Sequence, residues 1–277
     1  MQDFCYHTHT TFSDGADTAE KMIKTAVALG WSEIGISDHL IVHKNFFQSP
    51  SFGFLTDRSS VNIYHDSFLG LDEYFFMCKK TICQIAEPFP IRVYIGAEVD
   101  FFEYPEWREE FEKFKKKADL DFYITGNHFL VTDDENIIEP DDIENHISEP
   151  AEQKRLISKH FGTIKNAVES GCFDFLAHID YMRRAKFCTD EAFKDEKRAI
   201  LESMARLNIP LEISTKGIRK NGYCYPDSKI LTAAAELKIP FLISDDAHSV
   251  KELGYNFAEA ERELQKHHIT NRWKMHQ

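Results

Sequence analysis

Short apolar runs and longer amphipathic stretches alternate along the whole chain. The short runs are rich in β-branched and aromatic residues, which favours strands over helices. Residues 91–98 and 240–245 have the composition of strands that are buried on both faces. The runs together predict seven strands, at residues 3–8, 33–38, 91–98, 121–127, 173–178, 209–214 and 240–245.

Between these runs, apolar residues recur at helical spacing. In residues 18–30 the apolar side chains fall on one face, and Gly30 is a typical stop signal at the C-terminal end of a helix. Ser and Thr are favourable residues at helix N-termini, because their hydroxyl groups can accept a bond from a free backbone N–H. Three further helices are predicted, at 150–171, at 189–207 beginning at Thr189, and at 228–238 beginning at Ser228.

Regular alternation of strands and helices predicts a mostly parallel sheet covered by helices. About seven strand–helix units favour a closed or distorted barrel over an open sheet. The first strand is followed by no glycine-rich GxGxxG turn, which argues against a dinucleotide-binding fold. Since no Pro/Gly-rich linker divides the chain, we expect a single α/β domain over residues 1–277.

One segment interrupts the alternation. Residues 40–70 show no clear periodicity and carry five phenylalanines, at positions 46, 47, 52, 54 and 68. A connection this long inside a compact domain is usually functional or disordered, and so many aromatic residues argue against disorder. A lid or pocket wall and a satellite core under a long connection are equally good interpretations.

Charge and composition narrow the function. The formal net charge is −13, which argues against nucleic acid as the main partner because duplex binding requires a cationic surface. No apolar run approaches the roughly 20 residues of a membrane span, and residues 1–7 do not resemble a secretory signal. The six cysteines show no CxxC pair. We therefore expect reduced thiols in a cytoplasmic protein, with the oligomeric state left open.

Metal-ligating residue types stand at nearly every predicted strand end. A lone histidine in such a position is more often structural, but the joint pattern is different, because strand ends converge on one face of an α/β barrel. Imidazole with carboxylate is a ligand set for Zn, Mn or Fe. The pattern predicts a metal site built from His7, His9, Asp14, His39, Glu98, His128, His178, Asp246 and His248.

These residues resemble the motifs of the polymerase and histidinol phosphatase (PHP) family, and within it the histidinol-phosphate phosphatases. The likeness extends over nearly the whole chain. It is carried by His7-Thr-His9, Ser37-Asp38-His39, Gly96-Ala97-Glu98, Gly126-Asn127-His128, Ala177-His178 and Asp246-Ala247-His248. The resemblance implies a distorted seven-stranded (β/α) barrel that binds two to three divalent transition-metal ions, either Zn, Mn or Fe.

The resemblance also implies how the ligands are shared among the ions. His7, His9, Glu98 and Asp246 would hold the first ion. Glu98, His128 and His178 would hold the second, with Glu98 as the bridge between them. Asp14, His39 and His248 would hold the third.

A second group follows the sixth predicted strand. Residues 214–219, Ser-Thr-Lys-Gly-Ile-Arg, and the later Tyr225-Pro226 resemble the family's Asn-Thr-Ser-Gly-Leu-Arg and Tyr-Pro stretch, with Ser214 and Lys216 as departures. An arginine can bind phosphate through two parallel hydrogen bonds, although a surface ion pair is the alternative for any single arginine. The candidate substrate-binding residues are Arg183, Lys216, Arg219 and Tyr225.

The resulting functional prediction is a metal-dependent phosphomonoesterase that hydrolyses L-histidinol phosphate to L-histidinol and phosphate, a step of histidine biosynthesis. Three divalent ions would exceed the charge of three carboxylates by +3, which suits a hydroxide and a phosphate dianion. Asp246 and His248 are candidate catalytic residues, and either Asp246 or a water on the metals protonates the leaving group. A phosphodiesterase or nuclease, a phosphatase for another small monoester, an amidohydrolase and a non-catalytic metal-binding domain are the alternatives.

Overall fold

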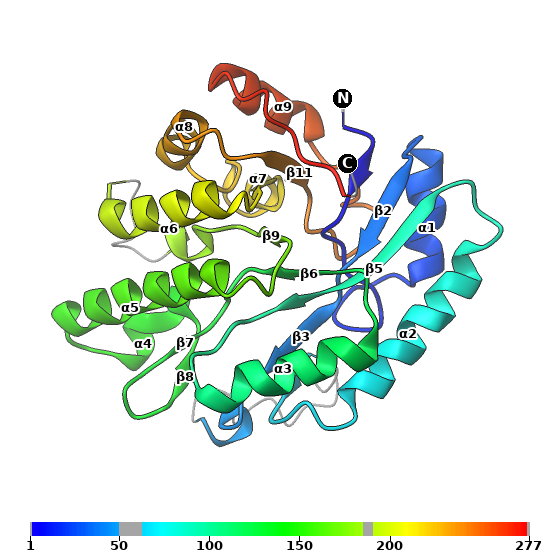
Figure 1. Cartoon of the computed structure of the whole chain (residues 1–277). Coiled ribbons are helices and arrows are strands. Elements are labelled where there is room, and N and C mark those ends of the chain that lie inside the picture. The colour runs from blue at the N-terminus through cyan, green and yellow to red at the C-terminus, as the bar shows by residue number, and fades with distance from the viewer. Residues whose placement is uncertain (1, 50–62, 185–190, 276–277) are drawn as a thin grey trace.

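The core of the molecule is a barrel of parallel strands (Figure 1). The computed structural model describes residues 2–49, 63–184 and 191–275, with the backbone alone for Arg183 and Arg184. Each predicted strand overlaps one of the observed strands. In spatial order these are β1 (Phe4–Cys5), β2 (Glu33–Ile36), β5 (Arg92–Val99), β6 (Phe122–Thr125), β9 (Phe175–Leu176), β10 (Leu211–Ser214) and β11 (Phe241–Ser244).

The barrel closes through residues just beyond the first and last strands. Thr8 and Ala247 form an isolated parallel bridge, and the backbone N–H of His9 donates to the carbonyl oxygen of Ala247 at 2.8 Å. This contact brings the segment after β1 beside the segment after β11. The predicted distorted α/β barrel is therefore confirmed, and its closure joins two segments that carry candidate ligands.

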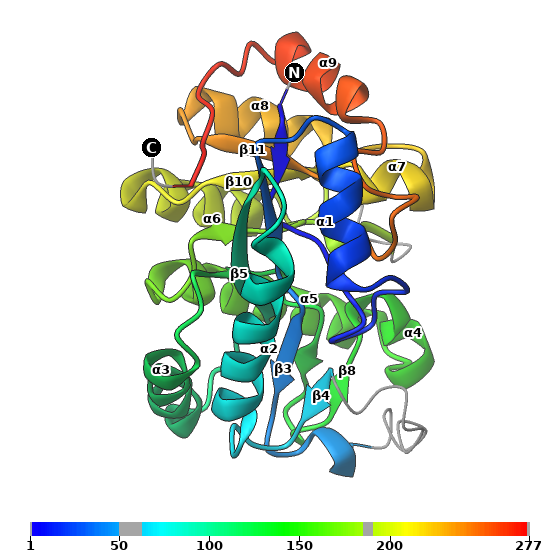
Figure 2. The ribbon, with the colours of Figure 1, turned by 90° about the vertical axis from the view of Figure 1, so that its right-hand side faces the viewer.

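Helices surround the barrel on its outside (Figures 1 and 2). α1 buries Ala19, Met22, Ile23 and Ala26 on the face that the sequence predicts. The helices are α1 (Ala19–Ala28), α2 (Leu71–Ala86), α3 (Pro105–Ala118), α4 (Ile143–His146), α5 (Pro150–Glu169), α6 (Lys194–Leu207), α7 (Lys216–Asn221), α8 (Ser228–Glu236) and α9 (Phe257–Lys266). The described residues also form the 3-10 turns η1 (Phe46–Gln48), η4 (Pro140–Asp142) and η5 (Tyr181–Arg184).

α8 begins at Ser228, as the sequence predicts, but its capping residue differs from the prediction. Asp227, rather than Ser228, caps α8, because its extended backbone lets the carboxylate accept from the N–H groups of Lys229 and Ile230 at 2.8 and 2.9 Å. α6 begins at Lys194, and the predicted start at Thr189 lies outside the described residues.

The described parts of residues 40–70 form the wall of an aromatic cluster. β3 (His39–Val42) pairs in parallel with β4 (Tyr64–His65), outside the main path of the barrel. Phe46 is fully buried and its ring stacks on Tyr64 with centroids 4.7 Å apart. Phe68 is also buried, Phe47 is about half exposed, and positions 52 and 54 lie outside the described residues. The remaining small sheet is the hairpin of β7 (Leu130–Val131) and β8 (Ile137–Ile138).

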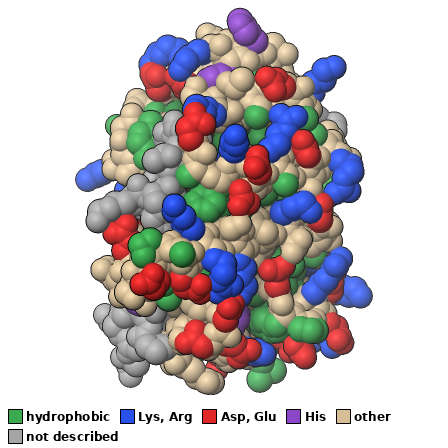
Figure 3. Space-filling view, turned by 90° about the vertical axis from the view of Figure 1, so that its left-hand side faces the viewer, with side chains coloured by type: hydrophobic (Ala, Val, Ile, Leu, Met, Phe, Trp, Pro, Cys, Tyr) green, Lys and Arg blue, Asp and Glu red, His purple; other side chains and the backbone are tan. Residues whose placement is uncertain are grey.

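Three further observations on the described residues concern membrane-spanning helices, the cysteines and the surface charge. No helix in the described chain is long and apolar enough to cross a membrane. The five described cysteines are all free of disulfide bonds. On the face drawn in Figure 3, basic and acidic side chains are interspersed, so that neither sign forms a continuous stripe.

Candidate metal centre

The nine predicted ligands come together at the carboxyl ends of the barrel strands. His7 and His9 follow β1, Glu98 lies near the end of β5, and His128 follows β6. The other five are His178 after β9, Asp246 and His248 after β11, His39 at the start of β3, and Asp14 in the loop before α1. All six imidazoles and three carboxylates therefore converge on one end of the barrel.

Most of the cluster is removed from solvent. His7, His9, Glu98, His178 and Asp246 are each 0% exposed. Asp14 and His248 retain partial access, with side-chain exposures of 32% and 23%. The cluster therefore has a buried floor and one open side.

The Glu98 carboxylate lies at the middle of the cluster. Its Oε1 atom faces Nε2 of His178 at 3.0 Å and Nε2 of His128 at 3.5 Å. Its Oε2 atom faces three further imidazoles, with Nε2 of His7 at 3.2 Å, Nε2 of His9 at 3.4 Å and Nδ1 of His39 at 3.1 Å. Glu98 thus has the position that a carboxylate bridging two ions needs.

Two other carboxylates complete the charge of the site. Asp246 Oδ1 is 3.3 Å from Nε2 of His9, and its Oδ2 is 2.7 Å from Nζ of Lys216. Asp14 Oδ2 is 3.2 Å from Nε2 of His248 and 3.6 Å from Nε2 of His39. His9 therefore lies between the buried floor and the open side.

The donor atoms fit divalent metals, because many of them are buried and have no hydrogen-bond partner. A buried polar atom without a partner is costly and rare in folded proteins. Metal coordination would satisfy these atoms together. They include His7 Nε2, a ring nitrogen of His9, His39 Nδ1, Glu98 Oε2 and Asp246 Oδ1.

Geometry groups the ligands slightly differently from the predicted sets. Ligand atoms within 4.8 Å of one another form three groups: His9 with Asp14, His39 and His248; His7 with Glu98 and His178; and His7 with His9 and Asp246. His9 thus joins the group on the open side as well as the buried one. The assignment of each ligand to a particular ion stays a prediction.

The protein's own cations hold the carboxylates ionised. Burial alone would raise the pKa of Glu98, but the positive charges of His7 and His128 outweigh burial and hold that pKa well below its usual range. For Asp246, burial is likewise outweighed by Lys216 and His7. Both carboxylates are therefore available as anionic ligands.

Three imidazoles hold protons in exchange. Burial would lower the pKa of His7, but Glu98, Glu212 and Asp246 outweigh it and hold that pKa well above its usual value. Burial would lower the pKa of His9, but Asp246 and Glu98 outweigh it and raise the pKa to about 9. Burial also opposes protonation of His128, and there Glu98 and Asp100 raise the pKa to about 9. Metal ligation requires a neutral imidazole, so protons and metal ions compete for these nitrogens.

Two further buried carboxylates orient the ligands. Glu212 Oε2 accepts a hydrogen bond from Nδ1 of His7 at 2.6 Å, and its Oε1 accepts from the backbone N–H of His178 at 3.3 Å. Asp100 accepts from Nδ1 of His128 at 2.8 Å. A carboxylate on Nδ1 leaves the Nε2 lone pair for a metal. Sequence reasoning missed both carboxylates, although Glu212 stands out as an acid inside a buried strand.

Gly126 is required by the close packing of the ligands. A Cβ atom at this position would lie 2.1 Å from Cε1 of His178 and 2.7 Å from Oε1 of Glu98. The segment before His128 therefore admits no side chain here. This explains glycine in the Gly126-Asn127-His128 motif.

The predicted substrate-binding residues divide into two kinds. Lys216 is largely buried and contacts the cluster through Asp246. Arg219 lies further out, where Nη1 and Nη2 donate to the carbonyl oxygens of Asp245 and Asp246 at 2.7 and 3.1 Å. Tyr225 is buried beside a hollow lined also by Lys216 and Arg219. The side chain of Arg183 lies outside the described residues.

Tyr181 is a site residue that sequence reasoning missed. It opens the 3-10 turn η5, directly after the segment that carries His178. Its ring lies 5.2 Å from that of His178 and 5.3 Å from that of His128, measured between centroids. Tyr181 therefore covers part of the cluster. Its only sequence signal is its position three residues after a candidate ligand.

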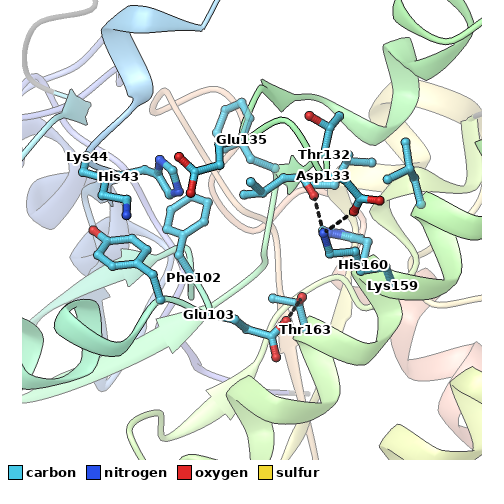
Figure 4. A pocket seen from close by; sticks show the side chains of 15 residues that line it. His43, Lys44, Phe102, Glu103, Thr132, Asp133, Glu135, Lys159, His160 and Thr163 are labelled. Atoms are coloured by element: carbon cyan, nitrogen blue, oxygen red, sulfur yellow. Dashed lines mark hydrogen bonds and ion pairs between the residues drawn. The ribbon is translucent and has the colours of Figure 1, made fainter.

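A separate cavity of about 420 Å³ lies beside the metal centre and contains none of the nine ligands (Figure 4). Phe129 lines both this cavity and a hollow at the metal centre. Three of its charged groups are already paired, Lys159 with Asp133 at 3.2 Å and Glu103 with the Thr163 hydroxyl at 2.6 Å.

Fold and site together define a (β/α) barrel protein with a metal-ligating centre at its strand ends. The PHP domain family model matches residues 6–216. The chain therefore belongs to the PHP domain family.

Individual relatives agree with this assignment. The chain is 25% identical over 260 residues to a "Probable histidinol-phosphatase" of Deinococcus radiodurans, covering 93% of this chain and 91% of the relative. A histidinol phosphate phosphatase from Lactococcus lactis, solved with Zn, L-histidinol and phosphate, superimposes with a TM-score of 0.67 at 23% identity, covering 95% of this chain and 93% of that one. A Listeria monocytogenes structure, provisionally assigned as a histidinol phosphatase, has a TM-score of 0.72 at 22% identity, covering 92% and 99%.

Glu212→Gln should weaken metal binding, because a neutral amide no longer fixes the protonated Nδ1 of His7. The loss of such a partner typically costs about 10–100-fold in metal affinity, which competition with a chelator would measure. Glu33→Gln is a matched control, since Glu33 is also a buried strand carboxylate but bonds to the Tyr6 hydroxyl, away from the ligands. Equal metal affinity in Glu212→Gln and the wild-type chain would disprove the orienting role.

Metal binding should release protons near pH 7, because His9 and His128 have pKa values of about 9 without metal. Below a pH of about 9 these imidazoles hold protons that the metal ion must displace. The apparent affinity for metal should therefore rise with pH and level off above about 9. Zn titration by calorimetry in buffers of different ionisation enthalpy would count the protons. His146→Ala, an exposed position on α4, should release the same number. Affinity independent of pH would contradict the proton competition.

Proposed function

We propose that the chain is a metal-dependent phosphomonoesterase and that its substrate is L-histidinol phosphate. The observation that carries the proposal is the largely buried cluster of nine candidate metal ligands, with the Lys216 ammonium at its edge, 2.7 Å from Asp246. The named activity of the Deinococcus relative, and the histidinol and phosphate bound by the Lactococcus enzyme, support the choice of substrate.

The nine ligands would hold divalent metal ions at the strand ends. Such ions act as Lewis acids toward a phosphoryl oxygen and lower the pKa of a bound water, which then serves as the nucleophile. Glu98 is central enough to bind two ions, since its two oxygens face different imidazoles. Glu212 and Asp100 keep the Nε2 atoms of His7 and His128 free for coordination.

Lys216 supplies the cation that is best situated for the phosphate. Burial would lower its pKa, but Asp246 outweighs burial and raises the pKa above its usual value, so that the ammonium stays charged. The Lys216 ammonium has three N–H donors, so it can donate to a phosphate oxygen as well as to Asp246. Arg219 supports this side by fixing the carbonyl oxygen of Asp246, and its remaining donors are available to substrate.

Asp246 and His248 are the candidates for moving a proton to the leaving oxygen. His248 lies on the open side, with Nδ1 3.4 Å from Asp246 Oδ1 and Nε2 3.2 Å from Asp14 Oδ2. Both residues are also candidate ligands. A water at the site is the other source of this proton.

A phosphomonoester fits the site better than a nucleic-acid strand. The hollows beside the ligands have volumes of about 340 and 140 Å³, and the larger one is the size of a small-molecule site. A single strand would need a long basic groove with stacking rings, whereas the net charge is −13. The phosphodiesterase alternative therefore ranks second.

The metal-loaded chain should hydrolyse L-histidinol phosphate far faster than a bis-aryl phosphodiester. Lys216→Met should lower kcat/KM for the monoester by about 10–150-fold, the range for one lost charged hydrogen bond. Phosphate release under identical metal loading measures both effects. Lys251→Met, at an exposed lysine outside the hollows, should match the wild-type chain. A diester constant at or above that for histidinol phosphate would promote the phosphodiesterase alternative.

A further inference from the structure

The metal centre opens to solvent through two hollows that meet. One has a volume of about 340 Å³ and the other about 140 Å³. Both are lined by Asp14, Tyr181, Lys216 and His248. A substrate held at these shared residues can therefore extend into either hollow.

The larger hollow is cationic. Besides the shared Lys216, its described lining includes Arg219 and Lys220. Its other carboxylate is Glu252, which lies 3.4 Å from Nε of Arg219 and accepts from the backbone N–H of His248 at 2.7 Å. Glu252 is thus engaged with the protein, and this hollow suits the phosphate.

The smaller hollow has the opposite character. Its described lining adds no lysine or arginine to Lys216, and its one carboxylate outside the metal-ligand set is Glu139. The remaining wall is apolar and aromatic, from Ile41, Ile63, Tyr64, Phe129 and Tyr181. The Tyr64 ring is held by Phe129, with centroids 5.8 Å apart.

Tyr181 marks the boundary between the two environments. Burial raises the pKa of its phenol, the Lys216 charge opposes that rise, and the Glu139 charge adds to it. The pKa of Tyr64 is raised first by burial and then by Glu139. Glu139 lines the smaller hollow together with both rings, and Lys216, which lines both hollows, also acts on Tyr181.

We propose that Glu139, with Tyr64 and Tyr181, forms the subsite that selects phosphomonoesters carrying an ammonium group beside the ester carbon. This inference rests on the proposed phosphatase function and adds to it the residue that reads the amine. With the phosphate at Lys216, the smaller hollow receives the rest of the substrate. Glu139 accepts from the ammonium, and the aromatic rings contact the ammonium and the imidazole.

The charge pattern explains selection against other small phosphomonoesters. Glu139 is exposed in the free chain, so water solvates its carboxylate. A sugar phosphate or simple alkyl phosphate that covers Glu139 would remove this water without offering a cation in return. Such a subsite selects substrates in two ways: its carboxylate attracts an ammonium group, and it disfavours substrates that remove water from the carboxylate without supplying a positive charge.

The test compares two substrates that differ only in the amine, L-histidinol phosphate and its deamino analogue, imidazolylpropyl phosphate. Both are assayed with one metal-loaded preparation each of the wild-type chain, Glu139→Gln and Glu135→Gln. Glu135 is a matched control, because it is an exposed acid on the neighbouring hairpin that bonds to Asn45 and lines the separate cavity. Metal content is checked in all three.

The wild-type chain should prefer the amine substrate, and Glu139→Gln should lower that preference about tenfold, as expected for a charged hydrogen bond partly screened by solvent. Glu135→Gln should keep it. An unchanged ratio in Glu139→Gln, or a wild-type chain that cleaves both substrates equally, overturns this proposal while the phosphatase function stands. If the wild-type chain cleaves neither substrate, the proposed function itself fails, and the amine subsite fails with it.

Discussion

Electrostatic compensation in the buried end of the barrel is the constraint on which the rest of this structure depends. Three carboxylates and six imidazoles crowd together, and Glu98 alone has five imidazoles within 3.5 Å. Uncompensated charge in such a place is strongly unfavourable. In the metal-free chain, imidazole protons and the Lys216 ammonium compensate the charge of the carboxylates. Divalent ions would also compensate this charge, and they would in addition satisfy buried atoms that have no hydrogen-bond partner.

The backbone is shaped to make this crowding possible. Asn127, His178 and Asp246 all have positive φ angles, at 45°, 21° and 47°, so the chain turns sharply where ligands are delivered. Gly126 leaves room for the His178 ring. Strained conformations of this kind persist where the surroundings over-determine them, and they are concentrated at functional sites. Hydrogen bonds from Glu212 and Asp100 then fix the rings that the turns present.

The barrel and the convergence of the nine candidate ligands could be predicted because both follow local rules. Strand runs and helical spacing are visible in the sequence, and parallel strands bring their carboxyl ends to one face. The contacts that complete the site depend on distant pairings. Nothing local in the sequence joins Lys216 to Asp246, His7 to Glu212, or Tyr181 to the His128 ring. The sequence also does not show that Asp227 caps α8. Asp227 and Ser228 could each act as the cap, and the backbone geometry decides between them.

The most direct test of the account is the transition-metal content of the purified, folded chain, measured by elemental analysis after incubation with Zn, Mn or Fe and removal of free ions. The account predicts about two to three bound ions per chain, with the loss of most of them in His7→Ala or His178→Ala variants that remain folded. A folded wild-type chain that retains no transition metal, or that keeps full phosphatase activity when stripped of metal, would contradict it.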